Sequence, residues 1–377
     1  MQLESFSFRP ASGWSVPSFP PLDSDSTLVL AFGCPGNDSC GSNLEKLSAA
    51  YPRALFLGCS TAGEILGRSI HDGTVVVTVC RFEKSQLKSA TLPIPSTANS
   101  NEVGRALAQT LRSPNLRGVL VISDGLSVNG SELVKGLNSV LPPETIITGG
   151  LAGDGDRFQK TWVLHDRKRE SGWVSAIGFY GDQVTIGHGS KGGWDVFGTE
   201  RLVTRSNGNI LYEIDGKSAL GLYKLYLGDL AVGLPANALL FPLGLRREKD
   251  SETQLVRTIL SIDEKAESMT FAGDIPEGSL VRFMRANFDR LVDGAGEAAR
   301  LANQPNKADV LAIAISCVGR KLVLGDRAEE EVEAVRDTLP KKSHLIGFYS
   351  YGEISPYSTG RCELHNQTMT LTTISED

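Results

Sequence analysis

The chain has 377 residues, of which 41% are hydrophobic and 22% are charged. This composition is typical of a globular protein, and the length allows two domains or one large duplicated domain. The formal net charge of −6 argues against nucleic acid as the main partner, because phosphate binding normally needs a basic face.

The first 26 residues are rich in proline and serine and predict an irregular lead-in. They contain no basic segment followed by an apolar stretch, so no signal peptide is expected. The longest uncharged segment, 230–245, is short for a membrane span and contains two prolines. We therefore expect a cytoplasmic protein without membrane insertion. The six cysteines lack CxxC or zinc-ribbon spacing, and reduced, mostly buried thiols are expected.

One strand–helix–strand unit recurs three times along the chain, each time at about the 30-residue length of a βαβ unit. A proline follows each expected helix, at Pro52, Pro142 and Pro340. The strand, helix and strand are expected at 27–33, 42–52 and 54–65, then at 118–125, 130–142 and 145–156, and last at 309–317, 328–340 and 344–354.

Further strands and helices separate these units. Two strands at 74–82 and 85–94 precede a helix at 101–111, and strands at 254–263 and 268–275 precede a helix at 285–302. The fold class predicted is α/β, namely an internally duplicated mixed-sheet α/β sandwich with helices packed outside, built from repeated strand–helix–strand units.

Each unit ends in a glycine followed by an acid. Alignment of the second strands superposes Gly63, Gly153 and Gly352, which precede Glu64, Asp154 and Glu353. The first and third copies agree best, as "GCSTAGEI" and "GFYSYGEI". This pairing predicts a duplication with equivalent sites in two halves.

These two phrases, with "GGLAGDGDRF" and the central "NGNILYEIDGKSALGLYKLYLG" at 207–228, resemble the bacterial FIST (F-box and intracellular signal transduction) sensory proteins. The resemblance implies an N-terminal FIST domain at 27–216 and a C-terminal one at 217–377. The chain departs from the family in "WDVFGT", where Val196 and Thr199 replace prolines that many members carry.

What the resemblance implies is a sensor without enzyme activity that binds an amino-acid-like or other small polar ligand. It would pass its state to a separate signalling protein, such as a histidine kinase, a cyclic-di-GMP enzyme or a chemoreceptor. No cofactor is expected. A subset of the family senses nitric oxide through heme, so heme b is the alternative.

The repeated turns are the candidate ligand cradle. Their glycines allow close backbone approach, their hydroxyls offer hydrogen bonds, and the two glutamates could receive an ammonium or guanidinium. Such loops lie at the carboxyl ends of strands, where α/β proteins often bind ligands. The alternative is a tight turn whose acid caps neighbouring amides. The candidate ligand-binding residues are Cys59, Ser60, Thr61, Gly63, Glu64, Gly153, Asp154, Tyr349, Ser350, Tyr351, Gly352 and Glu353.

The sequence offers two other candidate chemistries, heme binding and hydrolysis. For heme, His188 is the candidate iron ligand, because small residues follow it and Trp194 could wall a macrocycle; the alternative is an ordinary strand-end histidine. A hydrolase using Cys59 or Ser60 is disfavoured, since "GCSTAG" lacks the spacing of a nucleophile elbow. No metal-binding motif appears, and 328–337 predicts a solvated helix face.

Overall fold

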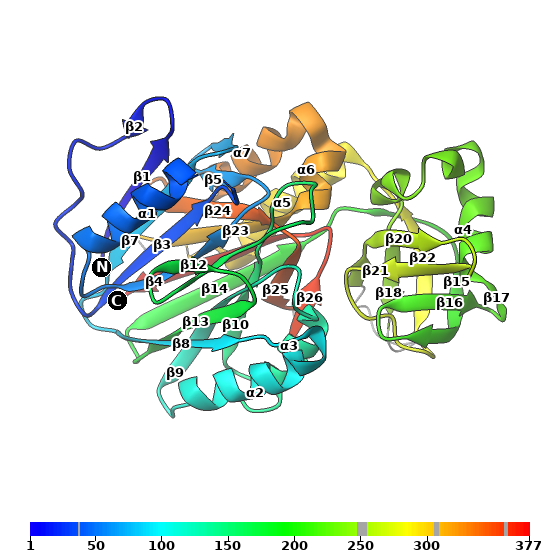
Figure 1. Cartoon of the computed structure of the whole chain (residues 1–377), viewed down its shortest axis with the longest axis horizontal. Helices are drawn as coiled ribbons and strands as arrows, with labels where there is room; N and C mark the ends of the chain where they lie inside the picture. The colour runs from blue at the N-terminus through cyan, green and yellow to red at the C-terminus, as the bar shows by residue number, and fades with distance from the viewer. Residues whose placement is uncertain (37, 247–254, 305–308, 358–360) are drawn as a thin grey trace.

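A computed structural model describes residues 1–36, 38–246, 255–304, 309–357 and 361–377. Figure 1 shows a large α/β part, which carries both chain ends, beside a smaller part made mainly of strands. We call the large part the body and the small part, residues 195–285, the barrel. The predicted mixed α/β fold class is confirmed.

The body contains three sheets that repeat one strand order. In each sheet the two strands of the repeated unit lie parallel, and two antiparallel strands follow on one side. The recurrence seen in the sequence is therefore a recurrence in space. The strands, in sheet order, are β4 (Leu55–Ser60), β3 (Thr27–Gly33), β7 (Val75–Arg81) and β1 (Gln2–Arg9); β10 (Ile146–Leu151), β9 (Leu116–Ser123), β13 (Trp173–Tyr180) and β8 (Gln86–Pro93); and β24 (His344–Ser350), β23 (Leu311–Cys317), β27 (Met369–Glu376) and β14 (Val184–Lys191). A short β2 (Gly13–Trp14) extends the first sheet beside β1.

The three copies are interlocked by strand exchange. After its second parallel strand, each copy sends a strand pair to the sheet of another copy, and the three exchanges close a cycle. No copy completes its own sheet, so the three form one body. The exchanged pairs are β5 (Glu64–Leu66) with β6 (Ser69–His71), which joins β24; β11 (Val163–His165) with β12 (Lys168–Glu170), which joins β4; and β25 (Gly352–Pro356) with β26 (Cys362–His365), which joins β10.

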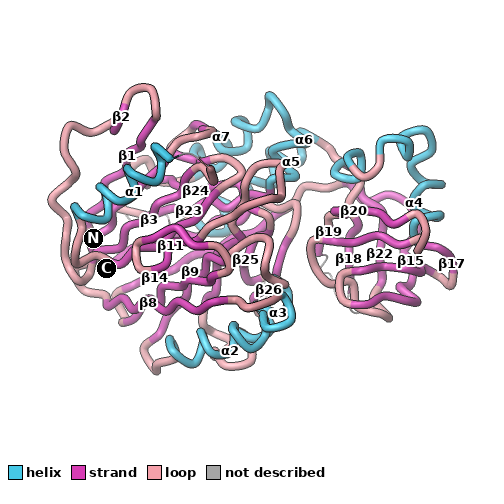
Figure 2. The backbone as a smooth tube through the Cα atoms, in the orientation of Figure 1, coloured by secondary structure: helices cyan, strands magenta, loops and turns pink. Residues whose placement is uncertain are grey.

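The inner faces of the three sheets share one apolar core. Leu30, Ile122 and Ile313 are fully or nearly fully buried in it, and the rings of Phe32 and Phe348 lie 4.7 Å apart. The helices pack on the outer faces, as predicted (Figure 2). They are α1 (Asp38–Ala50), α2 (Ser100–Leu111), α3 (Gly130–Asn138), α5 (Phe288–Ala302), α6 (Val318–Leu324) and α7 (Ala328–Thr338), with short 3-10 turns η1 (Thr97–Asn99) and η4 (Gly325–Arg327).

The barrel is inserted in the third copy, between β14 and α5, and has a core of its own that includes Tyr223, Phe271 and Phe283. The predicted division at residues 216 and 217 runs through it. Its elements are β15 (Asp195–Asn207), β16 (Ile210–Ile214), β17 (Lys217–Ser218), α4 (Ala219–Leu227), η2 (Gly228–Gly233), η3 (Ala236–Leu240), β18 (Leu243–Arg246), β19 (Leu255–Arg257), β20 (Ile259–Asp263), β21 (Ser268–Phe271) and β22 (Leu280–Arg285).

Two sequence expectations concern the environment of the chain. None of the helices in the described ranges combines the length and the apolar character that a membrane span requires. Cys34 and Cys40 are joined by a disulfide, so the prediction of reduced thiols is wrong for this pair. The other cysteines, Cys59, Cys80, Cys317 and Cys362, are free and buried.

Candidate functional site

The three turns that follow β4, β10 and β24 meet at one end of the body. Each turn donates a backbone N–H to a carbonyl of another turn, so that three hydrogen bonds form a cycle. The structure therefore brings the predicted ligand-binding residues together, at the carboxyl ends of the parallel strands. The bonds run from Ala62 to Tyr349 (2.8 Å), from Tyr351 to Leu151 (3.2 Å) and from Gly153 to Ser60 (3.0 Å).

Glu64 lies buried behind the first turn, with 1% of its surface exposed. Its Oε1 accepts a hydrogen bond from the Thr61 hydroxyl at 2.5 Å. Its Oε2 accepts from the backbone N–H of Thr74 at 3.0 Å and from the Thr74 hydroxyl at 2.8 Å. Burial raises the pKa of Glu64 to about 7, and these hydrogen bonds oppose the rise.

Glu353 repeats this arrangement in the third turn and is fully buried. Ser350 donates to its Oε1 at 2.9 Å, while Thr368 donates its hydroxyl at 2.8 Å and its backbone N–H at 3.2 Å to Oε2. Burial raises the pKa of Glu353 to about 8. Each glutamate thus ties the turn after the second parallel strand, β4 or β24, to the threonine that precedes β7 or β27, which is the geometry of the turn-capping alternative. Their role in ligand binding stays a prediction.

A hollow of about 400 Å³ lies over the first turn and is lined by Thr61, Gly63 and Glu64. Asp72 and Arg157 also line it, so this hollow is polar and charged. It is the place at which the predicted polar ligand would reach the first copy.

Asp154 does not occupy the place that the sequence alignment gave it. Glu64 pairs with Phe348 and Glu353 pairs with Gly150, whereas the strand position that corresponds to them in the second copy, opposite Cys59, is held by Val163. The alignment of Asp154 with the two glutamates is therefore wrong in space. The loop of the second copy is longer, and this length shifts the register.

Asp154 instead organises that longer loop. Its carboxylate accepts hydrogen bonds from the Tyr351 hydroxyl and, at 2.9 Å each, from the backbone N–H groups of Phe158, Gln159 and Lys160. Burial acts to raise the pKa of Asp154, but these donors outweigh it and the pKa is lowered. The loop holds the Phe158 ring stacked on Tyr351, with centroids 4.4 Å apart and planes 15° apart.

Cys59 and Ser60, the candidate nucleophiles of a hydrolase, lie in surroundings that make them poor nucleophiles. Cys59 is fully buried, and burial raises the pKa of its thiol well above the usual value. The Ser60 hydroxyl oxygen accepts a hydrogen bond from the Trp162 backbone N–H at 3.0 Å. A thiol without thiolate character and a hydroxyl engaged by a backbone amide are poor nucleophiles.

Tyr349 belongs to a buried ionic network that the sequence did not reveal. Its hydroxyl donates to Glu331 at 2.8 Å, and Glu331 pairs with Arg320 at 2.7 Å with both side chains fully buried. The prediction of a solvated face for 328–337 is thus wrong for Glu331. The network joins α6 and α7 to β24 and supports the third turn from behind.

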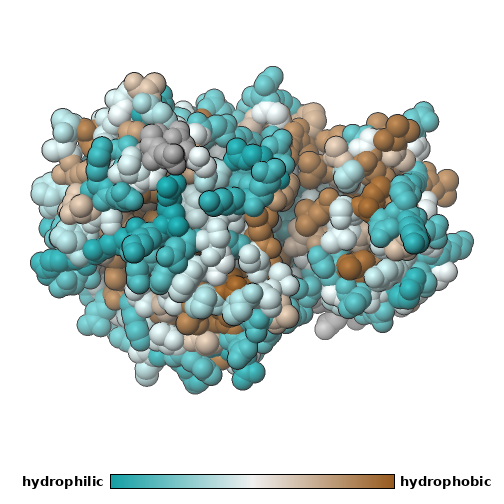
Figure 3. Space-filling model, in the orientation of Figure 1, coloured by the Kyte–Doolittle hydropathy of each residue, from teal (hydrophilic) through white to brown (hydrophobic). Residues whose placement is uncertain are grey.

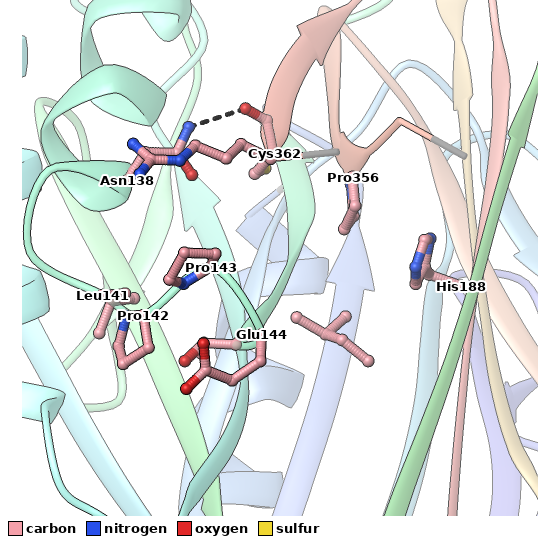
Figure 4. Close-up of a pocket in the computed structure, with 11 residues that line it drawn as sticks. Asn138, Leu141, Pro142, Pro143, Glu144, His188, Pro356 and Cys362 are labelled. Atoms are coloured by element: carbon pink, nitrogen blue, oxygen red, sulfur yellow. Dashed lines mark hydrogen bonds between the residues drawn. The ribbon is translucent and has the colours of Figure 1, made fainter. Parts of the chain in front are cut away.

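His188 lies on β14 and lines a pocket of about 160 Å³ together with Pro142, Glu144 and Cys362 (Figure 4). Trp194 is not among the residues that line this pocket; it packs in a separate apolar cluster with Val256. Ligand pockets usually hold roughly 300–1,000 Å³, so the surroundings of His188 do not fit a macrocycle. We derive no function through heme; a visible spectrum after heme addition tests that alternative. The described residues also contain no cluster of three or more side chains able to hold a metal ion.

An apolar hollow of about 490 Å³ lies between the body and the barrel, beside the third turn. We call it the cleft cavity. Figure 3 shows apolar side chains gathered along the junction of the two parts. A neighbouring hollow of about 340 Å³ shares Phe158, Leu260, Ala272 and Tyr351 with it, so the two form one cleft. The cleft cavity is lined by Asp156, Phe158, Pro235, Ala236, Leu239, Thr258, Ile259, Leu260, Ala272, Cys317, Val318, Gly319, Leu322, Tyr351 and Asn366.

Of the twelve predicted residues, Tyr351 lines this cavity. Sequence reasoning missed Asn366 and Thr258, which lie in the cavity wall. One signal was present: "HDGT" at 71–74 and "HNQT" at 365–368 occupy corresponding turns of the first and third copies. That pair would have aligned Asp72 with Asn366.

An apolar cleft between two parts of a molecule, with few charged groups in its wall, is the kind of hollow in which proteins commonly bind small molecules. Family models agree with this class. The model of the FIST N domain matches residues 27–217, and that of the FIST C domain matches residues 219–356. The chain belongs to the FIST family, which confirms the resemblance noted in the sequence, and FIST domains are generally small-ligand-sensing domains of signal transduction. A search of curated proteins finds no match.

Proposed function

We propose that this protein is a non-catalytic sensor whose small ligand binds in the cleft cavity. The observation that supports this most is that the cavity is lined from both parts of the molecule. Phe158, Val318 and Tyr351 come from the body, while Pro235 and Leu260 come from the barrel.

A ligand in this place would contact both parts at once. The chain passes between them at residues 192–194 and 286–287. Because the ligand's contacts depend on how the barrel sits against the body, binding favours the arrangement in which both walls are close. The change in the barrel would be the signal passed to a separate signalling protein, such as a histidine kinase, a cyclic-di-GMP enzyme or a chemoreceptor.

A cavity-filling variant tests this site. A library of small metabolites is screened by thermal shift against the wild-type chain, and each binder is then titrated by calorimetry into Ala236→Trp. Ala236 is exposed in the cavity wall, so an indole there would occupy the ligand's volume without disturbing the core. We expect binding to be lost.

The matched control is Ala266→Trp, which adds the same side chain to an exposed turn of the same barrel away from the cavity. This variant should bind as the wild type does. Binding that survives in Ala236→Trp would contradict the proposed location.

A further inference from the structure

Two residues that line the cleft cavity carry three buried polar side-chain atoms without a hydrogen-bond partner among the described residues. They are Nδ2 and Oδ1 of Asn366 and Oγ1 of Thr258. Asn366 is 0% exposed and Thr258 is 4% exposed. Folded proteins pair nearly all buried polar groups, and an unpaired one lowers stability. Such a cluster in one cavity points to a partner that the chain itself does not supply.

The backbone around Asn366 is firmly held, so this unpaired amide does not result from a loose loop. On one side, His365 hydrogen-bonds through Nε2 to the Ser355 carbonyl at 2.9 Å. On the other side, the carbonyl of Gln367 accepts from Trp194 at 2.8 Å, and Thr368 is bound to Glu353. Exchanging the nitrogen and oxygen of the amide leaves the finding unchanged, because both atoms lack a partner.

The remainder of the wall decides which ligands can enter. It is mostly apolar, with exposed Phe158, Leu260 and Leu322 at 44–47%. Among the described lining residues none is Arg, Lys or His, and the one charged group is Asp156, which is exposed. A carboxylate or phosphate would lose its water here without gaining a counter-charge. This wall therefore disfavours anions and zwitterions, including free amino acids.

An asparagine amide presents one donor and one acceptor side by side. The molecule that satisfies both at once must carry an acceptor and a donor on the same edge. A lactam has this edge, because its ring holds the C=O and the N–H on the same side. The asparagine–adenine pair in nucleic-acid recognition uses the same two-point geometry.

We infer that the cleft cavity binds an uncharged, largely apolar molecule with a lactam edge. Because Asn366 is 0% exposed, its amide must turn into the cavity to reach the ligand. The lactam carbonyl then accepts from Asn366 Nδ2, its N–H donates to Asn366 Oδ1, and the Thr258 hydroxyl supplies a third contact. This inference rests on the proposed function and names the class of ligand for that site.

A series of four small probes tests the inference on the full chain by calorimetry and thermal shift. Oxindole carries the lactam edge; N-methyloxindole lacks the donor; indane lacks both polar groups; and oxindole-5-carboxylate keeps the lactam edge and adds a negative charge. We expect oxindole to bind at least about tenfold more tightly than each of the others, because a site built to hydrogen-bond discriminates strongly against analogues that leave it unpaired.

Asn366→Leu should abolish this preference while the protein still folds, with a Tm equal to or above that of the wild type, because an apolar side chain replaces an unpaired amide. The control Asn207→Leu, at an exposed position of β15, should keep it. No preference for oxindole, or a preference that survives in Asn366→Leu, would overturn the ligand class. If Ala236→Trp abolishes the binding of the probes in that case, the cleft cavity stands as the site; if it does not, the proposed function fails as well.

Discussion

The turns of the first and third copies share one hydrogen-bonding arrangement, but one pair of corresponding residues has very different surroundings. In both, a buried glutamate receives the hydroxyl of a residue three positions earlier and two groups of a threonine that begins the next strand. Two residues before that threonine the copies diverge. Asp72 is exposed and pairs with Lys321, whereas Asn366 is buried and its side chain has no hydrogen-bond partner in the described part of the chain. The glutamate and its hydrogen-bond donors hold both turns in shape, whereas Asn366 is the residue that we assign to ligand binding.

The reason for the difference is what covers each turn. The barrel is inserted in the third copy and lies over its turn, so Asn366 lines an apolar cleft between the two parts. The turn of the first copy faces the polar hollow beside Asp72 and Arg157. The following substitutions and pH changes test what the two turns share and where they differ.

The largest effect is expected from removing either glutamate. Glu64→Ala or Glu353→Ala leaves a buried backbone N–H and two hydroxyls without their acceptor, and should lower the free energy of unfolding by about 4 kcal/mol. Urea denaturation measures this. Asp72→Ala is the control and should change stability by under about 1 kcal/mol. If the glutamates act only on a ligand, neither alanine variant will be destabilised.

Of similar size is the dependence of stability on pH. The folded pKa values of about 7 for Glu64 and about 8 for Glu353 lie above the ordinary 4.5. Between pH 4.5 and 8 the unfolded chain has released these protons while the folded chain still holds them, so stability falls as pH rises and levels off above 8. The loss is roughly 3 to 5 kcal/mol per glutamate.

Glutamine mimics the protonated side chain, so Glu353→Gln and Glu64→Gln should each remove part of this pH dependence. The pH dependence that remains in Glu64→Gln, which keeps Glu353, should extend about one pH unit higher than the dependence that remains in Glu353→Gln, which keeps Glu64. Denaturation midpoints measured from pH 5 to 9 would show this. Identical pH profiles for the wild type and both glutamine variants would contradict the assignment of raised pKa values.

A reciprocal exchange tests the divergent position. Asn366→Asp places a carboxylate in the cavity wall without a cation and should cost about 2 kcal/mol at pH 7, with recovery at acid pH as the group is protonated. The opposite change, Asp72→Asn, removes only the exposed pair with Lys321 and should cost less than about 1 kcal/mol. Equal effects would mean that the two turns have similar surroundings.

The smallest effect is expected at Tyr351, whose hydroxyl binds Asp154 and the Gly155 carbonyl. Tyr351→Phe keeps the ring stacked on Phe158 but loses these hydrogen bonds, for about 1 kcal/mol. Hydrogen exchange should become faster at residues 155–160. Unchanged exchange there would show that Asp154 holds the loop without the tyrosine.

The sequence was sufficient to find the three repeated units, their helices and the glycine–acid turns, because hydrophobic periodicity and prolines report local structure directly. It could not show the exchange of strand pairs between copies, since the alternation within β5, β11 and β25 is the same whichever sheet receives them. The misplacement of Asp154 has a similar cause: a longer loop shifts the register, and only the pairing of Val163 with Cys59 reveals it.

The sequence predicted only part of the candidate site, because it shows which residues repeat but not which side chains are buried or unpaired. Residues that repeat, such as Glu64 and Glu353, draw attention because they repeat, yet repetition follows from the shared fold. Asn366 stands out only when its burial and its missing partners are known, and Glu331 reads as a surface residue until Arg320 is placed beside it.

The most direct measurement is calorimetric titration of oxindole into the full wild-type chain, Asn366→Leu and Glu353→Gln under one set of conditions. We expect binding to be lost in Asn366→Leu and kept in Glu353→Gln, because the Asn366 amide contacts the ligand whereas the Glu353 carboxyl holds the turn. Binding that is kept in Asn366→Leu and lost in Glu353→Gln would contradict it.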